Sequence, residues 1–168
     1  MEILKSTPEN IDEIFSVYDA ATQYQKTVNN KNWKGFERER VLQEIEEGRH
    51  YVILEGETIA CTFLIKEEDR AIWKEKDADP AIYIHRIATN PIFRGGGYVK
   101  KIVEWAKEYC KQHQKDYIRI DTMSGNERLN KYYTSCGFTF LGVTDVEWSP
   151  ELPEHYRNIS LSIFEIKL

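Results

Sequence analysis

The sequence has few cysteines, no long apolar run and no excess of positive charge. Its three cysteines lie far apart and form no Cys-x-x-Cys pair, so we expect reduced and mostly buried thiols, with neither a disulfide nor a metal site. No apolar stretch comes close to the length of about 20 residues that a helix needs to cross a bilayer. The net charge of −5 opposes binding to a phosphate backbone, which argues against nucleic acid as a partner.

The first residues also lack the basic segment and apolar core of a signal peptide, so we expect a cytoplasmic protein without a membrane partner. A chain of 168 residues is long enough for one well-buried core and short for two, and we therefore predict a single domain over residues 1–168.

The most informative stretch, residues 81–103, predicts a strand followed by a glycine-rich turn and an amphipathic helix. β-favouring side chains end at Asn90-Pro91, glycines occupy 95–97, and apolar side chains then recur at three- and four-residue steps. The first N–H groups of a helix lack internal partners and attract anions, and glycines leave these groups uncovered. Arg94 adds a positive charge, so the stretch suits a pyrophosphate. A dinucleotide fingerprint is excluded because Lys100 stands at the place of its third glycine, and a P-loop is excluded because Gly-Lys-Ser/Thr is absent.

The remaining patterns predict an α+β chain. A helix over 8–24 begins after a Thr7-Pro8 cap, and a second helix runs from Trp33 to a stop at Gly48. Residues 66–79 are predicted to form a charged loop whose Trp73 either packs on the body of the protein or lines the entrance for an acceptor. Further patterns predict strands over 2–5, 51–54, 58–65, 81–89, 117–122, 138–143 and 159–166, a helix over 126–136 and a proline-containing lid over 144–158.

Two motifs resemble the GCN5-related N-acetyltransferase (GNAT) family. The run Arg94-Gly95-Gly96-Gly97-Tyr98-Val99 is similar to its acetyl-CoA loop, Arg/Gln-x-x-Gly-x-Gly/Ala, except that Val99 replaces a small residue at the last position. The run from Asn126 through Tyr133 to Gly137-Phe138 resembles the family's next helix in order and spacing. The resemblance implies a mixed, mostly antiparallel sheet of six to seven strands. Helices cover both faces of such a sheet, and it is splayed between its fourth and fifth strands, which are 81–89 and 117–122 here.

The resemblance also implies where acetyl-CoA, the expected co-substrate, is held. Backbone groups of a bulged fourth strand would contact the pantetheine, the glycine loop would hold the diphosphate, and the later helix would supply a CoA-contacting Asn and a Tyr near the sulfur. On this chain the residues are Ile87, Ala88, Thr89, Arg94, Gly95, Gly96, Gly97, Tyr98, Val99, Asn126 and Tyr133. Asn126 has a structural alternative as a residue of the helix start, where Ser124 and Glu127 would form a capping box.

The implied reaction transfers an acetyl group directly from acetyl-CoA to a primary amine. An amine with a pKa of about 10.4 is neutral in only about one molecule in two thousand at pH 7, so a base or a desolvating pocket is needed. His85, two residues before Ile87, is the candidate base, and a strand histidine held by hydrogen bonds is the alternative. Tyr133 is the candidate acid for the CoA thiolate, since that proton transfer costs a phenol only roughly 2 kcal/mol, and core packing is its alternative.

The predicted function is therefore an N-acetyltransferase that acts on a small-molecule or peptide amine. A non-catalytic acyl-CoA sensor on the same fold is the alternative from another class, and it is motivated by Val99 and by the uncertain base. The acceptor pocket would be built from the irregular segments 23–33, 66–79 and 144–158, which leave the identity of the acceptor open. Dimers are common in the family, so the resemblance also allows a homodimer.

Overall fold

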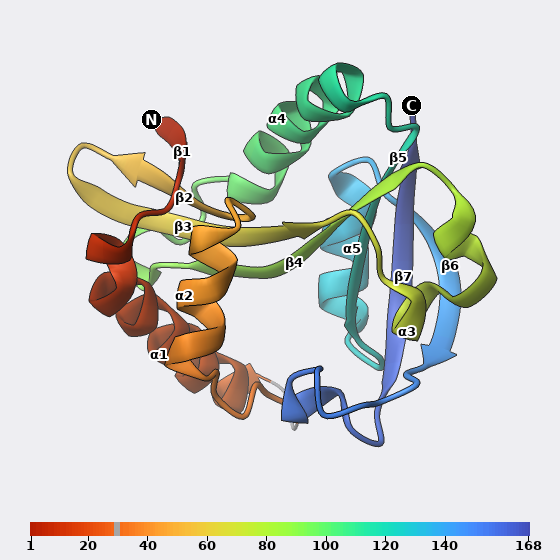
Figure 1. Ribbon diagram of the computed structural model, residues 1–168. Helices are drawn as coiled ribbons and strands as arrows, with labels where there is room; N and C mark the ends of the chain where they lie inside the picture. Colours follow the sequence, from red (N-terminus) through yellow and green to blue (C-terminus); the bar gives the residue numbers. More distant parts are fainter. Residues whose placement is uncertain (29–30) are drawn as a thin grey trace. The chain divides into compact units, whose positions relative to one another are not determined.

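The structure is a computed structural model that describes residues 1–28 and 31–168 (Figure 1). Residues 29 and 30 of the expected acceptor segment 23–33 lie outside the described residues. The strands are β1 (Glu2–Lys5), β2 (His50–Glu55), β3 (Thr58–Lys66), β4 (Ala81–Thr89), β5 (Tyr117–Met123), β6 (Thr139–Asp145) and β7 (Ser160–Lys167). The helices are α1 (Ile11–Val28), α2 (Arg38–Glu46), the single turn α3 (Arg70–Trp73), α4 (Tyr98–His113) and α5 (Glu127–Ser135).

The seven strands are hydrogen-bonded in the order β1-β2-β3-β4-β5-β7-β6. β4 and β5 run parallel, whereas β1–β2, β2–β3, β5–β7 and β6–β7 are antiparallel pairs. The expected mixed, mostly antiparallel sheet is thereby confirmed. Contacts within the chain define two compact units, residues 1–65 with 86–98 and residues 66–85 with 99–168.

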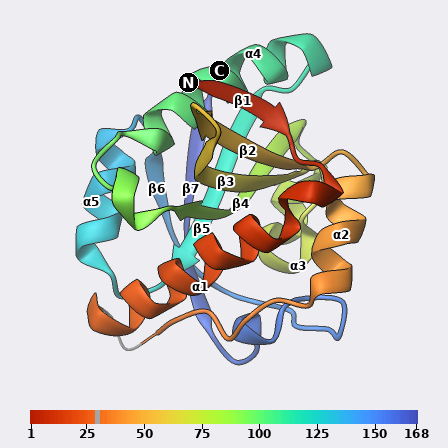
Figure 2. The ribbon, with the colours of Figure 1, turned by 90° about the vertical axis from the view of Figure 1, so that its left-hand side faces the viewer.

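In the first unit, β1, β2 and β3 form a meander, and the hairpin of β2 and β3 turns at Gly56, whose φ of +64° favours glycine. Helices α1 and α2 cover this meander with their apolar faces (Figure 2). The buried side chains of α1 recur at steps of three and four residues, because a helix places such residues on one side. The shared core consists of Ile11, Ile14, Val17, Tyr18, Val41, Ile45, Val52, Ile59 and Ala88.

The bounds of both helices in this unit differ from the predicted ones. A 3-10 turn over Pro8–Asn10 precedes α1, and α1 continues to Val28, because polar residues ended its apolar stripe without breaking the helix. The second helix begins at Arg38, so its predicted start at Trp33 is wrong. Gly35 adopts a φ of +97°, which no helix accommodates, and the Trp33 ring instead packs edge-on against Tyr18.

In the second unit, β5 lies between β4 and β7, with β6 as the outer strand (Figure 1). Side chains alternate along β5, so Ile120 pairs with Phe164 on one face while Arg119 lies opposite Tyr83 on the other. Tyr133 of α5 packs edge-on against Phe164, and Trp73 of α3 packs against Tyr83. Helices therefore cover both faces of the strands in this unit.

Residues 66–79 form more structure than the solvated loop that was predicted. The turn α3 and a 3-10 turn over Lys74–Ala78 occupy most of the segment. Trp73 is buried, which agrees with the alternative in which its ring packs on the body of the protein. The reason lies in β5, where Arg119 is only 1% exposed. Its guanidinium pairs with Asp79 at 2.6 Å and donates to the carbonyl of Lys76 at 2.8 Å, so a buried cation anchors the segment.

Cys61, Cys110 and Cys136 are free cysteines, and all three are buried, as expected for most of them. None of the helices within residues 1–28 and 31–168 has the length and apolar character that spanning a bilayer requires.

Candidate active site

The glycine loop is fixed to its own unit at both ends. Asn90 donates its backbone N–H to Ala60 and its side-chain amide to the carbonyl of Ile59, while its side-chain oxygen accepts from Ile92. At the far end, the hydroxyl of Tyr98 donates to Glu55 at 3.1 Å. The loop therefore leaves β4 and enters α4 in a defined conformation.

Each glycine of this loop has a local reason to be glycine. Gly95 and Gly97 have φ values of +87° and +69°, which side chains disfavour. A Cβ on Gly96 would lie 2.6 Å from the Tyr98 ring and 3.1 Å from the Phe93 carbonyl oxygen. The backbone directly before α4 is thus bare, which is the condition for N–H groups to approach an anion.

Arg94 lies beside this bare backbone, and its guanidinium stacks over the ring of Tyr24 in α1 at 3.6 Å from the ring centroid. The predicted loop residues from Arg94 to Tyr98 are therefore brought together around one turn. Val99 continues the same stretch as a buried residue of the first turn of α4.

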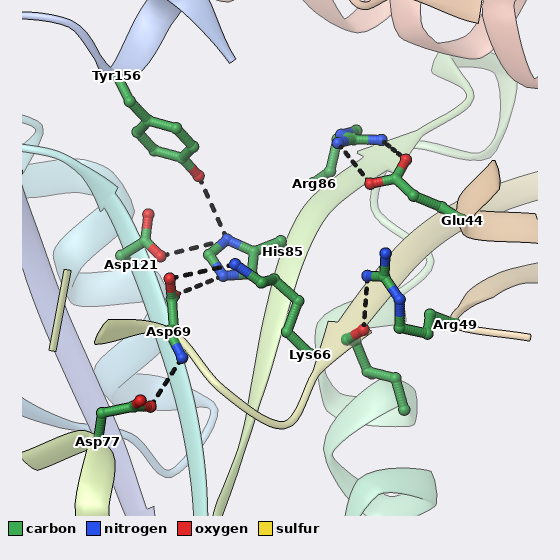
Figure 3. A network of polar contacts seen from close by, with 10 residues as sticks. Glu44, Arg49, Lys66, Asp69, Asp77, His85, Arg86, Asp121 and Tyr156 are labelled. Atoms are coloured by element: carbon green, nitrogen blue, oxygen red, sulfur yellow. Dashed lines mark hydrogen bonds and ion pairs between the residues drawn. The ribbon is translucent and has the colours of Figure 1, made fainter. Parts of the chain in front are cut away.

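The second half of β4 is interrupted at Arg86, which adopts a φ of +53° inside the strand. A left-handed residue within a strand is the signature of a bulge-like break, and it is uncommon for residues other than glycine. Arg86 is held there by Glu44 of α2 through contacts of 2.7 and 3.1 Å (Figure 3). Ile87, Ala88 and Thr89, the residues expected to contact pantetheine through their backbone, follow directly.

The pairing of β4 with β5 covers only part of each strand. The two strands are paired from Ala81 with Tyr117 to Ile84 with Ile120, and the pairing stops there. β5 nevertheless continues to Met123 and stays paired with β7 along this length. The residues that directly follow this pairing are His85 on β4 and Asp121 on β5.

His85 is the centre of a buried polar cluster at this point (Figure 3). Its Nε2 lies 2.7 Å from Asp69, its Nδ1 lies 3.4 Å from Oδ2 of Asp121, and the hydroxyl of Tyr156 lies 3.3 Å from the same Nδ1. Lys66 contacts Asp69 at 3.4 Å. We name these five residues the His85 cluster. Both ring nitrogens of His85 therefore have polar neighbours.

The charges of the His85 cluster follow from burial and from mutual attraction. Burial acts to lower the pKa of His85, but the carboxylates of Asp69 and Asp121 outweigh it and hold that pKa above its ordinary value. Burial raises the pKa of the Asp121 carboxyl to about 6, although His85 opposes the rise. Burial also acts to raise the pKa of Asp69, but His85 and Lys66 bring it below its ordinary value. His85 is therefore cationic in the range where Asp121 titrates.

The atoms that His85, Asp69 and Asp121 could offer to a metal ion lie within 4.8 Å of one another. The two imidazole nitrogens, however, face a different carboxylate each, at 2.7 and 3.4 Å. This is the geometry of an ion-pair chain, and we interpret the cluster as one.

Asn126 and Tyr133 share helix α5. Asn126 is the N-cap, and its side-chain oxygen accepts from the N–H of Leu129 at 3.1 Å, so the cap is Asn126 and not the suggested Ser124. Tyr133 is half-buried, with its ring edge-on to Phe138 and Phe164. Its ring therefore belongs partly to the packing of α5 on β7.

Sequence reasoning missed the partners of His85 and of Arg86. The sequence did contain one signal for Asp121. Ile84 of β4 pairs with Ile120 of β5, and each of these residues is followed by an ionisable side chain, His85 or Asp121. Asp69, Tyr156 and Glu44 come from distant segments, and no local pattern marks them.

A sequence model of the Acetyltransferase (GNAT) family matches residues 12–138 of the chain. Among curated proteins, the chain is similar to the uncharacterized N-acetyltransferase YesJ of Bacillus subtilis (strain 168). The two are 23% identical over 142 residues, which cover 80% of this chain and 79% of that protein.

Solved structures share the fold over nearly the whole chain. A GNAT-family acetyltransferase from Listeria monocytogenes 4b F2365 has a TM-score of 0.79 at 22% identity, covering 99% of this chain and 94% of that one. The structure of yncA from Salmonella typhimurium, which was solved with its cofactor acetyl-CoA, has a TM-score of 0.70 at 14% identity and covers 100% and 94% of the two chains.

Proposed function

The chain belongs to the GNAT family of acetyltransferases, and from this premise we propose that it transfers the acetyl group of acetyl-CoA directly to a primary amine of a small molecule or peptide. The observation that carries the proposal is the loop at Gly96, where a Cβ would meet the Tyr98 ring at 2.6 Å. A backbone that excludes side chains immediately before a helix suits the diphosphate of coenzyme A.

In this proposal the loop from Arg94 to Val99 contacts the diphosphate through its backbone, with the Arg94 charge nearby. The backbone groups of Ile87, Ala88 and Thr89 contact the pantetheine. The break at Arg86 supports this role, because a strand interrupted by a left-handed residue loses regular pairing and leaves N–H groups for a ligand. One such donor aimed at the carbonyl oxygen would stabilise the tetrahedral intermediate by roughly 2.7–4 kcal/mol.

Asn126 and Tyr133 take the remaining roles on α5. Asn126 contacts the cofactor from the helix start, and Tyr133 donates its phenolic proton to the departing CoA thiolate. Packing of the Tyr133 ring against Phe164 and Phe138 supports this assignment, because a general acid must be held in one orientation. His85 is a positioning residue rather than the free base, since both of its nitrogens face carboxylates.

The test is release of free CoA thiol from acetyl-CoA in the presence of a panel of amines that includes polyamines, aminoglycosides and peptides with a free N-terminus. The proposal requires thiol release that depends on one of these amines, with the acetylated amine identified by mass spectrometry. Tight acyl-CoA binding without release across the panel would instead support the non-catalytic sensor.

A further inference from the structure

The side chain of Arg94 connects the glycine loop with α1. Its guanidinium lies over the ring of Tyr24, with Cζ 3.6 Å from the ring centroid, and attraction of this kind extends to about 6 Å. Tyr24 stands about one turn before α1 ends at Val28. The 3-10 turn over Pro91–Phe93, directly before Arg94, also contacts α1. All of these residues belong to the first unit, so one compact body holds the stack.

Stacking occupies the face of the Arg94 guanidinium and leaves its edge available. A guanidinium carries five N–H donors, all in its plane, so a ring against the face uses none of them. Arg86 and Arg119 also lie over aromatic rings, but their donors pair with Glu44 and Asp79. Arg94 is exposed, and its guanidinium forms no hydrogen bond or ion pair with any residue of 1–28 or 31–168. Arg94 therefore combines a stacked plane with unused donors.

An oxyanion is the ligand that this arrangement suits. The planar N–H edge of an arginine matches the oxygens of a phosphate and can bind two of them at once. The backbone that follows Arg94 is bare, because Gly95 and Gly97 have positive φ values and Gly96 has no room for a Cβ. Coenzyme A carries phosphate twice, as a diphosphate and as a 3′-phosphate, whereas its pantetheine part carries none. The edge of the Arg94 guanidinium thus matches the phosphate chemistry of the coenzyme.

Resting on acetyl-CoA as the co-substrate of the proposed function, we propose that Tyr24 is a positioning residue that holds the Arg94 guanidinium ready for a phosphate of the coenzyme. A free arginine side chain samples many rotamers, and fixing it on binding lowers the affinity for the ligand. The Tyr24 ring reduces this loss, because it orders the guanidinium before the ligand arrives. Tyr24 lies in α1, outside both family motifs, and no local pattern marks it.

This role of Tyr24 has consequences that a purely structural role does not share. If the ring acts through Arg94, its removal matters only while Arg94 is present, so substitutions at the two positions are not additive. Stacking needs the face of the ring and not its hydroxyl, so phenylalanine can replace the tyrosine whereas leucine cannot.

The experiment is titration calorimetry of the full-length chain with acetyl-CoA, with urea unfolding to verify that each variant is folded. Tyr24→Leu is expected to weaken binding about threefold to tenfold, and Tyr24→Phe is expected to bind like the parent. Arg94→Gln should weaken binding by about tenfold or more, and the double variant Tyr24→Leu/Arg94→Gln should bind no more weakly than Arg94→Gln alone. The matched control is Phe15→Leu, which removes another ring of α1, one that packs edge-on against Tyr18, and it should leave the affinity unchanged.

The same titrations with 3′-dephospho-acetyl-CoA identify the phosphate that Arg94 contacts. A loss in Tyr24→Leu of equal size for both ligands assigns Arg94 to the diphosphate. A loss for acetyl-CoA alone assigns it to the 3′-phosphate. Either result supports the proposal, because the shared chemistry is a phosphate.

Parent-like affinity of Tyr24→Leu for acetyl-CoA would overturn the proposal, and so would Tyr24→Phe that binds as weakly as Tyr24→Leu. Additive losses in the double variant would overturn it as well, because Tyr24 would then act on the ligand without Arg94. Amine-dependent CoA release together with parent-like affinity of Tyr24→Leu would remove only the role of Tyr24. Binding that depends on Tyr24 and Arg94, without amine-dependent release, would remove the proposed acetyl transfer and leave the phosphate contact.

Discussion

Breaking the ion pair between Glu44 and Arg86 should strongly destabilise the first unit, because both side chains are buried, at 7% and 6% exposure. Two contacts join them, and the guanidinium also lies 4.3 Å from the centroid of the Phe36 ring. Glu44→Ala leaves the Arg86 charge buried without its partner. Removing one member of a buried pair costs about 3–5 kcal/mol, so the free energy of unfolding should fall by that amount.

The assay is urea unfolding at pH 7, with Glu47→Ala as the matched control. Glu47 pairs with Arg49 at 2.6 Å, but these side chains are 41% and 34% exposed, and exposed pairs are worth up to about 1 kcal/mol. Equal losses in the two variants would refute the reasoning. Because Arg86 sits at the break in β4, folded Glu44→Ala should also bind acetyl-CoA more weakly than Glu47→Ala does.

Three further predictions concern the loop, the acid and the cluster. Gly96→Ala should weaken acetyl-CoA binding tenfold or more in calorimetry, because the Tyr98 ring that its Cβ meets is buried and tied to Glu55, and relieving such overpacking costs about 1–3 kcal/mol. Gly56→Ala, whose Cβ meets nothing within 4 Å but whose φ is +64°, controls for the strain of a glycine-to-alanine exchange outside the loop, and equal affinities would contradict the prediction. Tyr133→Phe should lower turnover at least tenfold and leave acetyl-CoA affinity nearly intact, so unchanged turnover would remove Tyr133 from the mechanism. The pKa of Asp121 rises from 3.8 to about 6 on folding. The contribution of this carboxyl to the free energy of unfolding is therefore fully present below pH 4 and is lost as the pH rises through 6. The stability of Asp121→Asn relative to the parent should therefore increase by about 3 kcal/mol between pH 4 and pH 7, because one pKa unit corresponds to about 1.36 kcal/mol. Urea unfolding that gives the same difference between the two proteins at every pH would contradict this.

Sequence reasoning predicted the features that local chemistry determines. The strand, the glycine turn and helix α4 are adjacent in the chain, and their patterns are set by side-chain period and by residues that tolerate positive φ. The same reasoning placed α2 too early, because the aromatic residues Trp33 and Phe36 mimic a helical stripe. In the structure they pack on Tyr18 from a segment that Gly35 keeps out of the helix.

The features that were missed depend on residues far apart in the sequence. His85 was recognised as a candidate, but Asp69, Asp121 and Tyr156 reach it from three other segments, and only tertiary structure brings them together. Arg86 is a second case, since an arginine gives no signal of a positive φ. Its conformation is stabilised by Glu44, which lies on another element.

The central claim, that the loop from Arg94 to Val99 holds the diphosphate of coenzyme A, is tested most directly by titration calorimetry of the folded chain with acetyl-CoA and with S-acetylpantetheine, which lacks the diphosphate. Our account predicts saturable binding of acetyl-CoA and much weaker binding of S-acetylpantetheine. Equal affinity for the two compounds, or no saturation with acetyl-CoA, would contradict it.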